Sequence, residues 1–330
     1  MKTLVTGATG FVGQNLISEL LKKGYSVSVL VRSKKKIESL EDEIEIIEGD
    51  ITDPRSINPR IFRGVDVVFH IAGLISAFRE EEYMKVNFLG TKNLVQMIID
   101  SGYKPKFIYT SSLAAVGPGK DTNSVITEDD PPHPVDFYGK SKRKAEEFLI
   151  LMKNSINSVI LRPTAIYGYL DKALLSLFDI SLKLAFPVIK DSVISVIHVS
   201  DVVKAHILAA EKETKSAEIF NLSDGHRYTM EEIFNIINQI LLEQFSRRMR
   251  KLVVPRKFIL YISYIMRLIP PKLGESLKIV SPDTILRLCQ KSWFCTYEKA
   301  EKYLGFSPSY YAREGLKQSL LWYMKKSTFA

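Results

Sequence analysis

Cysteine is scarce in this sequence, since its 330 residues hold only Cys289 and Cys295. Neither stands near other metal-binding side chains at a zinc-type spacing, so we expect no metal site. Two cysteines also imply no disulfide framework, which is typical of a protein in a reducing compartment. Long hydrophobic runs are missing too, because no apolar run reaches the roughly 20 residues that a bilayer-spanning helix needs.

Signals for nucleic-acid binding and for targeting are absent as well. The formal net charge is +9 and the pI about 9.2, yet no basic stretch is interleaved with aromatic residues, so we expect no nucleic-acid partner. Such a charge fits an anionic ligand, a membrane surface or simply a basic enzyme. A strand predicted from residue 2 leaves no room for a signal peptide, which favours a cytoplasmic protein.

Glycine, by contrast, is concentrated in a turn at the start of the chain. Residues 4–6 favour a buried strand, and an amphipathic helix is predicted over 15–21. A strand, a glycine turn and a helix start together present backbone N–H groups to a phosphate. The spacing is G-x-x-G-x-x-G, and a tight turn without a ligand is the alternative. We predict a dinucleotide site at Gly7, Thr9, Gly10, Phe11, Val12 and Gly13.

The second predicted strand, 25–31, lacks the acidic residue that binds the ribose 2′-hydroxyl of NAD. Arg32 stands there instead, and three lysines follow at 34–36. A guanidinium suits a 2′-phosphate, so we expect NADP as the cofactor, with NAD as the alternative. An exposed basic loop would explain the same residues without a ligand.

Two further predicted strands end in residues that could meet the cofactor. Asp50, followed by Ile51, ends a strand over 45–47; its carboxylate could accept a bond from the adenine amino group or merely cap the next helix. The continuous apolar strand 65–73 is typical of a parallel sheet buried on both faces. Ala72 and Gly73 at its end let a ligand lie against the backbone. His70 within it is interpreted as a core histidine.

Alternating strands and helices predict an α/β fold with a doubly wound parallel sheet. Later strands are expected at 106–112, 158–163, 192–199 and 220–222, and helices at 81–101, 136–153 and 202–213. The remainder reads as mostly helical, at 230–243, 257–268, 297–304 and 312–326, whereas 174–189 is apolar without a clear strand pattern.

Ser112, Tyr138 and Lys142 are the residues expected to carry chemistry. Tyr138 and Lys142 are four apart, so they share one helix face. A free tyrosine has a pKa of about 10, and a nearby ammonium would lower it toward neutrality. Ser112 at a strand end could bond a substrate oxygen, so the three suit proton transfer coupled to hydride transfer. A chance surface pair would explain the tyrosine and lysine alone.

The motifs and their order resemble those of the extended short-chain dehydrogenase/reductase family over nearly the whole chain. The matching segments are TGATGFVG (6–13), GDITDP (49–54), FHIAG (69–73), VNFLGTKNL (86–94), YTSS (109–112), YGKSK (138–142), LRPTAIYG (161–168) and IHVSDVVKAH (197–206). The resemblance implies a Rossmann-type NAD(P)-binding domain over 1–165, completed by about 192–213. A smaller substrate-binding domain would take 166–191 and 214–330. The resemblance also implies that Tyr138 is the catalytic acid/base, that Lys142 is its partner, and that Ser112 is the third catalytic residue. It also places Asn87, Thr110, Pro163 and Ala165 against the cofactor.

Two branches of the family compete for the substrate. Sugar-nucleotide epimerases and dehydratases usually have an asparagine in place of Ala165 and an arginine near Ile194. The sequence is more similar to the 3β-hydroxysteroid dehydrogenase and dihydroflavonol reductase branch, which acts on an alcohol or ketone of a mostly apolar molecule. The apolar stretch 174–189 fits such a pocket, or ordinary core. A non-catalytic cofactor-binding assembly or scaffold protein is a second alternative.

Residues 247–269 concern the question of which partners the protein binds. Arginines and lysines at 247–257 precede the apolar stretch 258–266, and a basic cluster beside an apolar helix can lie on an anionic membrane. A helix of the substrate domain with a solvated basic flank is the alternative. The resemblance also suggests a homodimer through the helices around Asn87 and Tyr138.

Overall fold

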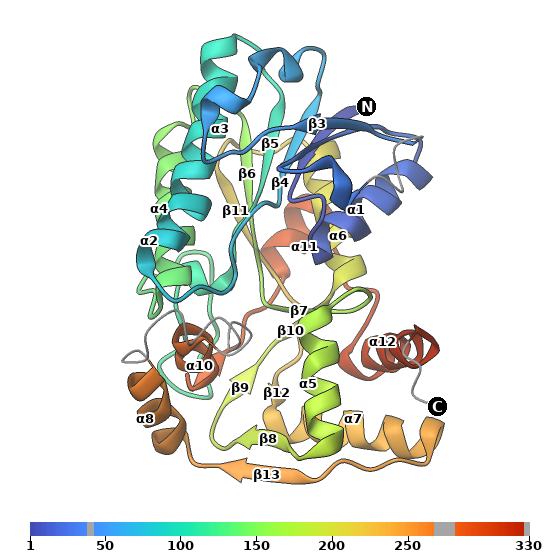
Figure 1. Ribbon diagram of the computed structural model, residues 1–330. Coiled ribbons are helices and arrows are strands. Elements are labelled where there is room, and N and C mark those ends of the chain that lie inside the picture. The colour runs from blue at the N-terminus through green and yellow to red at the C-terminus, as the bar shows by residue number, and fades with distance from the viewer. Residues whose placement is uncertain (38–42, 267–280, 327–330) are drawn as a thin grey trace.

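A seven-stranded parallel sheet forms one half of the molecule (Figure 1). The computed structural model describes residues 1–37, 43–266 and 281–326. The strands are β1 (Lys2–Thr6), β2 (Ser26–Val31), β3 (Glu45–Glu48), β4 (Val67–His70), β5 (Lys106–Thr110), β6 (Ser158–Pro163) and β11 (Glu218–Leu222). Their order is β3-β2-β1-β4-β5-β6-β11, so the direction of winding reverses between β1 and β4. Ligands of such sheets bind at the carboxyl ends of the strands beside this switch point. The predicted fold class is confirmed.

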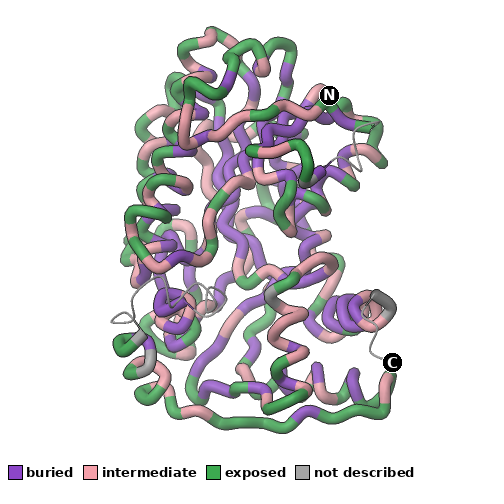
Figure 2. The backbone as a smooth tube through the Cα atoms, in the orientation of Figure 1, coloured by how far each residue is buried: buried purple, intermediate pink, exposed green. Residues whose placement is uncertain are grey.

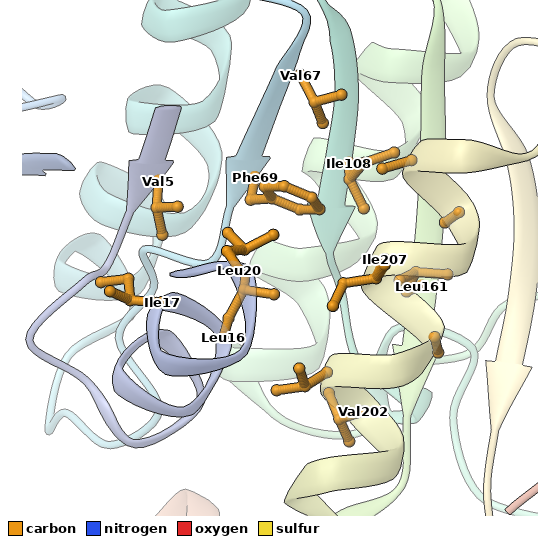
Figure 3. Close-up of a cluster of buried hydrophobic side chains, with 14 of the residues drawn as sticks. Val5, Leu16, Ile17, Leu20, Val67, Phe69, Ile108, Leu161, Val202 and Ile207 are labelled. Carbon is orange, nitrogen blue, oxygen red and sulfur yellow. The ribbon is translucent and has the colours of Figure 1, made fainter. Parts of the chain in front are cut away.

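Helices cover both faces of this sheet (Figure 1). On one face lie α1 (Phe11–Lys22), α6 (Val199–Glu211) and α11 (Glu298–Leu304), and on the other lie α2 (Glu80–Tyr83), α3 (Gly90–Ser101) and α4 (Phe137–Leu151). Figure 3 shows Leu16 and Leu20 of α1 and Ile207 of α6 directed at strand residues such as Phe69. These side chains are almost fully buried, and Figure 2 shows the buried backbone concentrated along the strands. Burial on both faces explains the continuous apolar strands.

The other half of the molecule is built from short strands and helices. The strand pairs are β7 (Ala165–Tyr167) with β10 (Val196–His198), β9 (Val193–Ile194) with β12 (Tyr228–Thr229) and β14 (Ser292–Trp293), and β8 (Phe186–Ile189) with β13 (Lys251–Val254). The helices are α5 (Lys172–Lys183), α7 (Met230–Phe245), α8 (Arg256–Met266), α10 (Pro282–Leu288) and α12 (Ala312–Lys326). A separate apolar cluster holds this half together, with Phe178, Phe186 and Leu316 among its buried members.

The predicted division at residue 214 does not follow the sheet. Strand β11 lies beyond it yet pairs with β6 in the central sheet. Helix α11 also returns to that half, where Ala300 and Leu304 are buried against the sheet cluster. Conversely, β9 and β10, expected to complete the Rossmann domain, join the small sheets, whereas α6 packs on the central one.

Two segments differ from the helices and strands that the sequence predicts. The single helix expected over 81–101 is split into α2, a π-helical turn (Met84–Leu89) and α3. The stretch 174–189 forms α5 and β8, and Phe178 and Phe186 in it are buried core. The expected helix 257–268 is present as α8 up to Met266, and 267–269 lie outside the described residues.

Candidate active site

The glycine turn lies at the switch point of the sheet, between β1 and α1. Gly7 has φ +76°, and a Cβ there would lie 2.6 Å from the Ala72 backbone nitrogen. A Cβ on Gly13 would lie 2.2 Å from the Gly7 carbonyl oxygen, so only glycine lets α1 start this close to β1. Gly10 precedes α1 and provides no side-chain cap, which leaves the first N–H groups of the helix available to an anion. A close backbone and an uncapped helix start fit a dinucleotide diphosphate.

The remaining predicted residues of this turn surround its open side. Thr9 is exposed like Gly10, and Phe11 and Val12 are half-buried. The Thr9 carbonyl accepts a bond from Gln14 Nε2 at 3.0 Å, which holds the turn against the helix. The turn is therefore rigid yet reachable from solvent.

Arg32 and Asp50 lie at the carboxyl ends of two neighbouring strands, β2 and β3. Arg32 is exposed directly after β2, and no acidic residue stands in its place. Asp50 Oδ1 accepts a 2.8 Å bond from Thr52 N, while Asp53 caps the short helix that follows. Asp53 therefore caps that helix, and the alternative interpretation of Asp50 as its cap is wrong. Ile51 is buried against Gly90 of α3.

Asn87 and Lys142 are buried beside the loop that follows β4. Asn87, buried in the π-helical turn, accepts a bond from Leu74 N at 2.7 Å and donates to Leu74 O at 3.0 Å. Lys142 Nζ lies 3.1 Å from where a Cβ of Gly73 would be, and donates to Thr110 O at 2.7 Å. Burial lowers the pKa of Lys142 to about 7, a shift that the Glu146 carboxylate opposes.

The two serines after β5 have different surroundings. Ser111 Oγ is buried and donates to Glu146 Oε1 at 2.6 Å. Glu146 in turn holds Arg162 through bonds of 2.8 and 2.7 Å, so Ser111 belongs to a buried ionic network. Ser112 lies near the Tyr138 side chain, and its hydroxyl lowers the pKa of that tyrosine. The structure therefore brings Ser112, and not Ser111, to the tyrosine.

Tyr138 lies in the first turn of α4, where the Asp136 side chain caps the helix by accepting from Gly139 N. Its side chain is only 7% exposed. Burial raises its pKa, while the positive charge of Arg287 and the Ser112 hydroxyl lower it. Tyr83 of α2 meets its ring edge-on, with centroids 6.2 Å apart. This ring is thus held from three sides, with the hydroxyl beside Ser112.

Pro163 and Ala165 lead from the central sheet to the small ones. Pro163 ends β6 opposite Leu222, and Ala165 starts β7 with an exposed side chain. Thr110 is buried and its hydroxyl bonds His206 Nε2 at 2.7 Å. Its backbone oxygen, not its side chain, therefore faces Lys142.

His70 is a buried core residue, as predicted. Its two ring nitrogens bond Thr6 Oγ1 at 2.7 Å and Thr91 Oγ1 at 2.9 Å. Burial lowers its pKa to about 3, and the charge of Lys142 adds to the effect. Within the described ranges, no group of histidine, cysteine and acidic side chains is arranged to hold a metal ion.

Arg287 is the part of the site that the sequence does not predict. It lies on α10, and its guanidinium carbon is 4.4 Å from the centroid of the Tyr138 ring. The arginine is 151 residues from its partner Asp136, so no spacing pattern connects them. The only local signal is a helix start at Ser281 and Pro282, whose serine caps α10.

Comparison with known proteins identifies related enzymes. The model of the 3-beta hydroxysteroid dehydrogenase/isomerase family matches residues 4–243. A ceramide reductase of Caulobacter vibrioides is 34% identical over 234 residues, covering 69% of this chain and 67% of that protein. A UDP-glucose 4-epimerase of Vibrio cholerae is 32% identical over 244 residues, covering 70% and 73%. A solved UDP-glucuronic acid 4-epimerase from Bacillus cereus, in complex with UDP-glucuronic acid and NAD, has a TM-score of 0.77 at 23% identity and 99% and 100% coverage. That structure shows the shared fold alone.

Proposed function

The chain belongs to the 3-beta hydroxysteroid dehydrogenase/isomerase family, within the extended short-chain dehydrogenases/reductases, and on that premise we propose that it interconverts an alcohol and a ketone or aldehyde on a mostly apolar small molecule. The family consists of NAD-dependent enzymes, so the chain is an enzyme of this type. The observation that supports the proposal is the buried Tyr138 side chain near Ser112, at the end of the sheet that carries the glycine turn.

In the proposed reaction, a bound nicotinamide cofactor would supply or accept a hydride. The glycine turn and the start of α1 would hold the diphosphate of this cofactor. Lys142 and Asn87 would lie along the bound cofactor. Tyr138 would give its phenolic proton to the substrate oxygen during reduction and take a proton from the alcohol during oxidation. Ser112 would donate a bond to the same oxygen and orient it. General acid–base catalysis of this kind contributes about 10²–10⁴-fold.

An apolar substrate is supported by the residues at two positions. Ala165 is exposed on β7, and Ile194 lies on β9 without a charge. The sugar-nucleotide branch usually carries an asparagine and an arginine there, which would bind a diphosphate. The apolar side of α5 contributes little to this argument, because Phe178 packs into the core while Ile180 and Leu184 are 50% and 70% exposed.

A sugar-nucleotide epimerase or dehydratase is the second candidate function. The similarity to the Vibrio cholerae epimerase, over 70% of the chain, favours it. Such an enzyme returns the hydride to the same substrate, so it shows no net change in the cofactor.

A panel of hydroxysteroids, aromatic ketones, and UDP- and GDP-sugars separates the two candidates. Absorbance of the reduced cofactor and the identity of the product are followed with each compound. We expect stoichiometric cofactor oxidation or reduction with an apolar alcohol or ketone. Conversion of a nucleotide sugar without net cofactor change would replace the proposal by the second candidate.

We propose NADP as the preferred cofactor, with NAD as the alternative. Arg32 is exposed at the end of β2, where its guanidinium can meet a 2′-phosphate. We also propose that residues 247–269, which the structure describes up to 266, rest on an anionic membrane surface. In the described residues no helix combines the length and apolar character needed to cross a membrane. The cytoplasmic location and the homodimer stay predictions.

A further inference from the structure

Arg287 is tied to the helix that carries the catalytic tyrosine. Its Nε donates to Asp136 Oδ2 at 2.6 Å, while Asp136 Oδ1 accepts from Gly139 N at 2.7 Å. One carboxylate therefore joins α10 to the first turn of α4. Trp293 Nε1 donates to the Arg287 carbonyl at 2.8 Å, which holds the end of α10 in place.

The guanidinium lies against the face of the Tyr138 ring, with its central carbon 4.4 Å from the ring centroid. A cation at this distance is attracted to the ring, and it is attracted more strongly once the ring carries a phenolate charge. Arg287 Nη2 is buried and has no hydrogen-bond partner in the described part of the chain. The N–H groups of Nη2 are thus free to respond to charge on the tyrosine, while Nε stays bonded to Asp136.

We propose that Arg287 is a positioning residue for Tyr138. The fixed positive charge of Arg287 stabilises the phenolate that remains when the tyrosine gives its proton to the substrate oxygen. The inference rests on the proposed function, because it assigns Tyr138 the acid/base role. In the opposite direction the same charge makes Tyr138 ready to accept a proton from the alcohol. Arg287 acts through the Tyr138 ring that it contacts.

Lys142 influences the pKa of Tyr138 less directly than the sequence suggests. Its ammonium bonds Thr110 O and lies 4.9 Å from the centroid of the Tyr109 ring, not over Tyr138. Among the influences on the pKa of Tyr138, burial raises it most, and the charge of Arg287 is the strongest that lowers it.

Charged and polar groups of several elements lie around the ring. Ser112 lowers the pKa of Tyr138, and Asp136 raises it through its charge. Tyr83 contacts the ring from α2, and Asp283 of α10 bonds the Phe137 backbone N–H at 2.9 Å. Because Asp136 partly offsets Arg287, the pair tunes the tyrosine without a large net charge.

A direct test measures the ionisation of residue 138 without turnover. A fluorotyrosine, whose phenol is more acidic than that of tyrosine, is placed at position 138, and its fluorine resonance is titrated with pH. In the Arg287→Gln background we expect the midpoint to rise by about one pH unit or more, since an opposite charge at this range shifts a pKa by about 1–3 units. Arg287→Lys, which keeps the charge, should retain most of the wild-type value.

Arg313→Gln is the matched control, because it removes an equal charge from the exposed ion pair with Glu243 on the far helices. It should leave the midpoint unchanged. If Arg287→Gln binds cofactor normally and titrates like the wild type, the proposal is overturned. If instead the wild type turns over no alcohol or ketone, the proposed function fails while the titration still decides the role of Arg287.

Discussion

At the scale of single residues, neighbours in the sequence take separate roles because their hydroxyls find different partners. Ser111 is bound to Glu146 in a buried ionic network, so it has no bond to offer a substrate. Ser112 lies beside Tyr138. A triad of serine, tyrosine and lysine could be predicted from order and spacing. Arg287 could not, because its contact with Tyr138 depends on how α10 folds back onto α4.

Arg32 offers a residue-scale prediction for cofactor choice. Arg32→Asp should weaken NADP binding about tenfold or more, since a charge-assisted bond contributes about 1.5–3 kcal/mol. The new carboxylate should also improve NAD binding by accepting from the ribose hydroxyl. Isothermal titration with both cofactors measures this, with Arg313→Asp as a control for added negative charge. An unchanged preference in Arg32→Asp would refute the choice of NADP.

At the scale of elements, the π-helical turn is the clearest departure from a regular pattern. Asn87 within it reaches across to the Leu74 backbone and donates to Ser141 Oγ at 2.9 Å. Thr91 also bonds the Asn87 carbonyl at 2.6 Å, which helps to hold the wider turn. Local periodicity predicts the helix here but not its widened turn, because the cause is a tertiary contact. Such turns are frequent at functional sites.

Helix α8 has an apolar face on the outside of the molecule. Phe258, Tyr261 and Tyr264 are 57–64% exposed, whereas Ile259 and Leu260 on the other side pack against the body. Lys257 is exposed on α8 itself, and Arg247, Arg248 and Arg250 are exposed before β13. An apolar helix face in a basic segment suits the interface of an anionic bilayer.

We therefore expect the protein to sediment with phosphatidylserine-containing vesicles and to be released by high salt. Phe258→Ser combined with Tyr261→Ser should reduce binding several-fold or more through loss of buried apolar area. Leu151→Ser removes a side chain that is 72% exposed on α4 and should have no effect. No binding to these vesicles at low salt would contradict the proposed surface.

At the scale of the whole molecule, the order of the strands determines where the residues of the candidate active site lie. The parallel sheet and its alternating helices follow from hydrophobic pattern, and they bring Gly7 and Ala72 together at the switch point. The path of the chain after residue 164 is less predictable. Strand β11 returns to the central sheet after short strands of the other half, and its five residues carry no signal of that partner.

Three buried histidines make the fold sensitive to acid. Burial lowers the pKa of His70 to about 3 and those of His198 and His206 to about 4. Each titrates near 6.5 in the unfolded chain. Between about pH 6.5 and 4 the unfolded chain therefore binds more protons than the folded one. The free energy of unfolding should therefore decrease as the pH is lowered through this window, by about 1.4 kcal/mol per pH unit for each histidine.

Urea unfolding between about pH 7 and 5 measures this slope. His206→Gln should make it shallower, because one titrating group is lost while an amide can still bond Thr110. Equal slopes in the wild type and His206→Gln would show that this buried histidine does not carry the effect.

The central claim is that Tyr138 transfers the proton in an oxidoreductase reaction, and Tyr138→Phe tests it most directly. With the best substrate of the panel, the variant should bind NADP or NAD as the wild type does, yet lose turnover by a factor of about 100 or more. Tyr303→Phe, at a tyrosine that is 55% exposed, is the control and should stay fully active. Turnover by Tyr138→Phe within a few-fold of the wild type would contradict the account.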